Sequence, residues 1–128
     1  MRLEKEVIKW ADDKELILLG NSYQQYAKFM EEGNEILVAM NKIDNLIKES
    51  DSKLNKVWSD ELEKEMREWI EKKEAATNEL KDAFGDTLVT LIILSAQYDL
   101  QLEDCLEVAY NEIKNRTGKT VGGTFIKD

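Results

Sequence analysis

The sequence predicts an all-α protein, on composition and on periodicity. The chain of 128 residues has no proline and only six glycines, and it is rich in Glu, Lys, Leu, Ile and Ala, which favour helices. Apolar residues recur with helical spacing along most of the chain. A chain of this length can bury one core, so we predict a single domain over residues 1–128, built as a bundle of four or five helices.

The first half of the chain is expected to hold two helices. Residues 1–14 form a short helix, because Leu3, Val7 and Ile8 recur at helical spacing. A break near Gly20 precedes a long helix from Ser22, a candidate N-cap, to about residue 48.

The middle of the chain, residues 45–77, is predicted to be an extended connection and a helix. Glu49–Ser52 is expected to be a loop because it is polar. The third helix should begin near Asn55 or Ser59 and run to about Thr77.

A fourth helix begins near Asn78, or the third continues through it. Residues 88–94 are apolar on nearly all sides, which indicates a central helix, and Asp99 should end it. A last helix is predicted over Leu102–Asn115, followed by a loop-like tail over residues 117–128.

Composition excludes several classes of function. The net charge of −9 argues against a nucleic-acid partner, and the absence of histidine excludes His-based catalysis and His metal sites. The single cysteine, Cys105, cannot form an intramolecular disulfide. The N-terminus lacks a signal-peptide core, and the longest apolar run, Leu88–Ala96, is too short for a bilayer. We expect a cytoplasmic protein with no membrane partner.

The first acidic cluster consists of Glu31, Glu32 and Glu35. On a helix these carboxylates fall within about 100° of one another, next to apolar residues. Lys28 shares their face, where it either contacts phosphate or pairs with Glu32.

The second acidic cluster consists of Glu79, Asp82 and Asp86, which follow one helical stripe. Two antiparallel helices that present these stripes to each other would gather hard oxygen ligands, which suit Mg²⁺ or Mn²⁺. The alternative for either cluster alone is a solvated helix face.

A group of polar and basic residues ends the last predicted helix and could hold phosphates. The alternative is that basic side chains favour a helix C-terminus through its dipole. The group comprises Asn111, Lys114, Asn115 and Arg116.

Three segments together resemble the MazG-like nucleotide pyrophosphohydrolases, in particular the short phage and Gram-positive form. They are Lys28–Ile36, which contains E-E-x-x-E, Asp82–Val89, and Tyr110–Lys119. The E-E-x-x-E motif alone is weak evidence, whereas the three blocks in this order are more specific.

The resemblance implies an all-α fold completed by dimerisation, as a homodimer or homotetramer. It implies Mg²⁺-dependent cleavage of a nucleoside triphosphate, (d)NTP, to (d)NMP and pyrophosphate, in nucleotide-pool housecleaning. It assigns substrate contacts to the basic group at the end of the last helix, and metal binding to Glu31, Glu32, Glu35 and Asp86.

The chain departs from the family pattern in the second motif. If Asp86 is the family's aspartate, the E-x-x-D glutamate falls on Ala83, and Asp82 would stand in for it. Alternatively, Glu79 and Asp82 are themselves the E-x-x-D pair. The segment between the two acidic motifs is also longer than expected for the short forms.

We interpret Glu31 and Glu35 as the catalytic carboxylates, with Glu31 accepting the proton of the attacking water. Two alternatives stay open. One is a different all-α hydrolase resembling the dimeric dUTPases. The other is a catalytically inactive helical interaction or regulatory protein, which the alanine at position 83 suggests.

Overall fold

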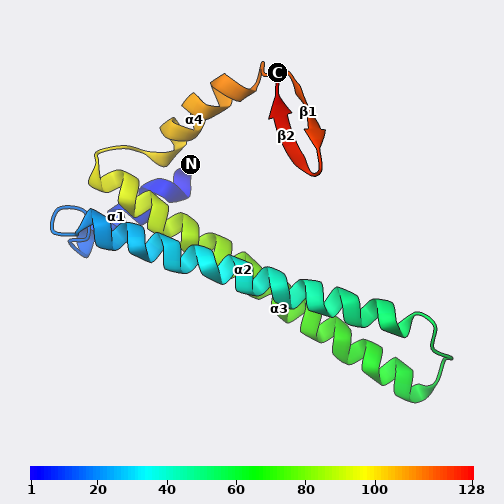
Figure 1. Ribbon diagram of the computed structural model, residues 1–128. Coiled ribbons are helices and arrows are strands. Elements are labelled where there is room, and N and C mark those ends of the chain that lie inside the picture. Colours follow the sequence, from blue (N-terminus) through cyan, green and yellow to red (C-terminus); the bar gives the residue numbers. More distant parts are fainter. The chain divides into compact units, whose positions relative to one another are not determined.

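The computed structural model describes residues 1–128 and is all-helical apart from one small sheet (Figure 1). This confirms the predicted fold class. The elements are α1 Arg2–Asp13, α2 Ser22–Lys53, α3 Asp60–Gln97, α4 Leu102–Ile113, β1 Gly118–Val121 and β2 Thr124–Lys127.

The chain divides into two compact units. One is continuous, Asn21–Leu91, and contains α2 and most of α3. The other combines Met1–Gly20 with Ile92–Asp128, and therefore contains α1, the end of α3, α4 and the sheet. We call them the hairpin unit and the terminal unit.

In the hairpin unit, α2 and α3 run antiparallel and side by side (Figure 1). Two hydrogen bonds join side chains of one helix to the backbone of the other. The Trp69 indole N–H donates to the Leu46 carbonyl at 2.6 Å, and the Gln25 amide donates to the Thr90 carbonyl at 3.1 Å. The first bond lies near the turn that connects α2 to α3, and the second lies near the start of α2, so together they fix the antiparallel register.

The buried side chains of the hairpin unit are mostly small. They are Ala39, Leu62, Ala76, Ala83 and Thr90. Alanines let two helices approach closely, but they remove little apolar surface from water. Many larger apolar side chains of α2 and α3 are exposed, among them Leu37, Met40, Ile47, Met66, Ile70, Phe84 and Leu88. The expectation that residues 88–94 lie centrally therefore holds for Thr90, Ile92 and Ile93 but not for Leu88.

The N-terminus of α2 is capped by Asn21 and not by Ser22. The Asn21 side-chain oxygen accepts hydrogen bonds from the backbone N–H groups of Tyr23 at 2.9 Å and Gln24 at 3.1 Å. Asn21 has extended backbone angles, as an N-cap requires, whereas Ser22 is already helical.

The predicted loop at Glu49–Ser52 is wrong, because α2 continues through it to Lys53. An ion pair between Lys53 and Glu49, at 3.2 Å and one helical turn apart, supports the last turn. The break lies later, between α2 and α3, where the Ser59 hydroxyl accepts a hydrogen bond from the Leu62 N–H at 3.0 Å. At Asn78 the helix continues, as the second of the two sequence-based alternatives stated.

In the terminal unit, a buried carboxylate joins α1 to α4. The Glu4 side chain is 1% exposed and accepts hydrogen bonds from the backbone N–H groups of Leu102 at 2.5 Å and Glu103 at 3.1 Å. The N-terminal amine of Met1 forms an ion pair with Glu103. Glu4 therefore satisfies the free N–H groups at the start of α4, a position that also favours negative charge.

The end of α3 contacts the segment after α1. The Gln97 amide donates to the Leu16 carbonyl at 2.9 Å, and a Cβ at Gly20 would lie 2.0 Å from the same carbonyl oxygen. Gly20 is thus required by close packing. Asp99 follows the end of α3 with a φ of 60°, which confirms that the helix stops there.

The tail is a β-hairpin, which the sequence analysis missed. β1 and β2 pair antiparallel, with Val121 opposite Thr124 and Gly118 opposite Lys127. Gly122 and Gly123 form the turn with φ values of 59° and 81°, which suit a two-residue turn between strands. Gly-Gly between β-branched residues was the available signal.

None of the helices has a stretch both long and apolar enough to cross a membrane.

Candidate functional site: an acidic groove between two helices

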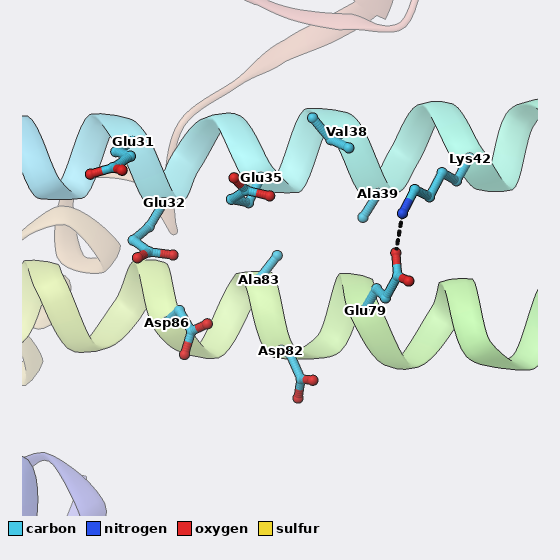
Figure 2. Close-up of a pocket in the computed structure, with 10 residues that line it drawn as sticks. All are labelled: Glu31, Glu32, Glu35, Val38, Ala39, Lys42, Glu79, Asp82, Ala83 and Asp86. Atoms are coloured by element: carbon cyan, nitrogen blue, oxygen red, sulfur yellow. Dashed lines mark hydrogen bonds and ion pairs between the residues drawn. The ribbon is translucent and has the colours of Figure 1, made fainter.

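A groove of about 440 Å³ lies between α2 and α3, within the hairpin unit (Figure 2). Six of its ten lining residues are acidic and one is basic. From α2 it is lined by Glu31, Glu32, Glu35, Val38, Ala39 and Lys42, and from α3 by Glu79, Asp82, Ala83 and Asp86. We call it the acidic groove. It brings together both acidic clusters of the sequence.

The α2 side of the groove carries the E-E-x-x-E motif. Figure 2 shows Glu32 and Glu35 directed towards α3, with Glu31 one turn from Glu35 on the same helix. The Glu32 side chain is 22% exposed, and its nearest cation is the Lys28 ammonium at 3.9 Å. The structure thus contains the predicted Lys28–Glu32 pairing. Lys28 itself does not line the groove.

The α3 side of the groove carries Ala83 between the acidic residues of the second cluster. Ala83 is buried and directed towards α2, at the centre of the groove (Figure 2). Asp82 and Asp86 both line the groove, and the Asp82 carboxylate points to the side of α3 away from α2 (Figure 2). The central position that faces Glu35 is therefore occupied by a methyl group and not by a carboxylate.

Glu79 is held by a cation that the sequence analysis did not select. The Lys42 ammonium donates to the Glu79 carboxylate at 2.8 Å, across the groove (Figure 2). Lys42 follows Glu35 by seven residues, and residues seven apart share a helix face. That spacing was the signal that could have indicated Lys42.

The predicted phosphate-binding group belongs to the other unit. Asn111 is in α4, and Lys114, Asn115 and Arg116 follow at its C-terminus. All four are exposed, and none of them lines the acidic groove.

The groove gathers more negative charge than its own side chains neutralise. Six acidic residues and one lysine line it, and carboxylate oxygens are the donors that Mg²⁺ prefers. The donor chemistry therefore fits a hard divalent cation. In this conformation no three acidic side chains converge into a ligand group.

No protein-family model, curated protein or solved structure matches this chain.

Proposed function

We propose that the protein is a Mg²⁺-dependent nucleoside triphosphate pyrophosphohydrolase that cleaves (d)NTP to (d)NMP and pyrophosphate. The observation that carries the proposal is the acidic groove, where carboxylates some fifty residues apart in the sequence line one hollow. The resemblance of the same residues to the MazG-like enzymes supplies the reaction and its role in removing unwanted nucleotides.

Glu32, Glu35 and Asp86 would hold the cation, with Glu31 beside them. When bound, the ion polarises the α-phosphate and activates a water for in-line attack. Glu31 accepts the proton that the water loses as its oxygen bonds to the α-phosphorus. The anhydride bond between the α- and β-phosphates breaks, and its electron pair leaves with pyrophosphate.

The substrate side of the proposal rests on the resemblance. It assigns contacts with the phosphates to Lys114, Asn115 and Arg116. Asn111 belongs to the same helix end, and Lys28, on the helix face of the first motif, is a further candidate cation. A basic group would offset the charge that develops on the leaving pyrophosphate.

A second copy of the chain is part of the same proposal. Two helices with an alanine-rich seam bury too little apolar surface for a stable core, and large apolar side chains remain exposed on both. Two such hairpins packed together would form a four-helix bundle, with those side chains inside. Light scattering should then give two or four times the mass of one chain, and a monomer at micromolar concentration would contradict this.

One observation favours a second candidate, an inactive interaction protein. Ala83 occupies the centre of the groove where the family pattern has a glutamate. A protein that has lost this ligand could retain the fold and the oligomer without turnover.

The deciding experiment measures pyrophosphate release from a panel of nucleotides, with and without Mg²⁺. The enzyme proposal expects release that requires Mg²⁺ and falls at least about 100-fold in Glu35→Gln. Asp44→Asn is the matched control, because Asp44 is an exposed acidic residue of α2 that does not line the groove.

The other outcomes separate the alternatives. Release from dUTP or dUDP alone would indicate a dUTPase-like hydrolase. No release from any nucleotide, with no change in Mg²⁺-dependent melting in Glu35→Gln, would leave only the interaction protein.

A further inference from the structure

Lys42 is the single basic residue among the ten that line the acidic groove. Its ammonium lies 2.8 Å from Glu79, and the two side chains are 54% and 52% exposed, so both charged groups are accessible to a ligand. An anionic substrate that enters a groove of six carboxylates needs cations to contact. Lys42 is the cation that the groove itself provides.

We propose that Lys42 binds a phosphate group of the substrate, and that it exchanges Glu79 for a phosphate oxygen when the substrate enters. This inference rests on the proposed function, because it assigns a contact within the same site. It adds a substrate-binding residue that belongs to the groove and to neither of the acidic motifs.

The position of Lys42 supports a role at phosphates distant from the carboxylates of the first motif. Lys42 follows Glu35 by seven residues, so it lies on the same face of α2, about 10 Å further along the axis. A cation held by Glu32, Glu35 and Asp86 would neutralise the phosphate next to them. A phosphate further along the groove meets Lys42.

The ammonium also has room to change partners. Lys42 and Glu79 both border a second hollow of about 380 Å³, which continues along the same two helices. An exposed ion pair is a weak interaction that solvent screens. A phosphate with more than one negative charge forms stronger, charge-assisted hydrogen bonds and should displace the carboxylate.

The alternative is that the pair only joins α2 to α3. The two explanations differ in how the loss of the Glu79 charge changes the affinity for phosphate. If Glu79 competes with phosphate for Lys42, removing the Glu79 charge strengthens phosphate binding. If the pair is only structural, removing either partner has the same small effect.

The experiment titrates the full chain with inorganic pyrophosphate in the presence of Mg²⁺, by calorimetry. Lys42→Met should weaken binding about tenfold or more, since a hydrogen bond to a charged group is lost. Lys42→Arg should stay within about threefold of the wild type, because it retains the charge. Glu79→Gln should bind about threefold more tightly.

Circular dichroism and melting of each variant show whether it folds. If Lys42→Met does not fold, Lys42→Gln and the sign of the Glu79→Gln effect decide. Unchanged affinity in the Lys42 variants would overturn the inference, as would weaker binding in Glu79→Gln or no binding by the wild type. Turnover of nucleotides is scored separately. An active enzyme whose pyrophosphate affinity does not depend on Lys42 would therefore refute this inference and leave the proposed function standing.

Discussion

In the terminal unit the Glu4 carboxylate is 1% exposed and accepts two backbone hydrogen bonds, from Leu102 and Glu103. In the hairpin unit six carboxylates border one groove, and only Glu32 and Glu79 have a cation within 4 Å. The first arrangement is complete without a ligand, because N–H groups at a helix start satisfy the charge. The second leaves negative charge that a bound cation would neutralise. The partners of a carboxylate, more than its burial, separate a structural acid from a candidate ligand.

The largest expected effect tests the groove through Asp86 and Asp82. Asp86→Asn should reduce Mg²⁺-dependent turnover at least about 100-fold, because it removes a proposed ligand charge. Asp82→Asn should change turnover by less than about threefold, since the Asp82 carboxylate points away from α2 (Figure 2). Steady-state pyrophosphate release measures both. Equal losses in the two variants would mean that the Asp82 carboxylate turns towards α2 and contributes to the site as much as Asp86 does.

The next effect tests the terminal unit through Glu4. Glu4→Ala should lower the free energy of unfolding by about 2–3 kcal/mol, because two buried N–H groups lose a charged acceptor. Glu4→Gln should cost about 1 kcal/mol, since one carbonyl acceptor remains. Urea unfolding measures both, with the exposed Glu6→Ala as the matched control. A Glu4→Ala effect no larger than that of Glu6→Ala would refute the structural role. A loss of Mg²⁺ binding in Glu4→Ala would indicate that Glu4 also contributes to cation binding.

A smaller effect is expected at the start of α2. Asn21→Ala should destabilise the protein by about 1 kcal/mol, because the N–H groups of Tyr23 and Gln24 lose their acceptor. Asn34→Ala, an exposed position within α2, serves as the control and should be neutral or slightly stabilising. If the two substitutions have equal effects in thermal unfolding, the Asn21 cap contributes nothing.

The smallest effect concerns two glycines. Gly85 is helical and a Cβ there would meet no atom within 4 Å, so Gly85→Ala should stabilise the chain by about 0.5–1 kcal/mol. Gly122 also has open space, but its φ of 59° strains an alanine, and Gly122→Ala should destabilise by about 1 kcal/mol. The sign of the two shifts in melting temperature is the test. A destabilising Gly85→Ala would indicate that a second copy packs against this face of α3.

Helical periodicity predicted the fold class, the start of α2 to within one residue and the start of α4. The prediction failed at one point, where a polar segment was interpreted as a loop. The segment Glu49–Ser52 has no apolar residue, yet it is helical, and the adjoining Lys53 pairs with Glu49 one turn back and with Glu65 of α3. The C-terminal hairpin was missed because the tail that contains the two glycines was predicted to be a loop throughout.

The acidic residues of the groove could be selected from the sequence because their stripes are local patterns. Two features could not. The pairing of Lys42 with Glu79 depends on the register between α2 and α3, which packing fixes and no single-helix pattern contains. The direction of the Asp82 carboxylate, on the side of α3 away from α2, likewise depends on how α3 is rotated against α2.

The length of the hairpin gives the spacing between the two acidic motifs a simple origin. Beyond the groove, α2 and α3 continue to the turn at Leu54–Ser59 and return. The forty-odd residues between the two acidic motifs therefore reflect the length of α2 and α3 beyond the groove, and this length does not affect the chemistry of the groove. Removal of seven residues, about two helical turns, from the end of α2 and from the start of α3 would retain the register at the groove. Related chains with this groove could then differ widely in the spacing of the two motifs. A sequence search that allows paired deletions in α2 and α3 would recognise such chains, whereas a search with a fixed motif spacing would not.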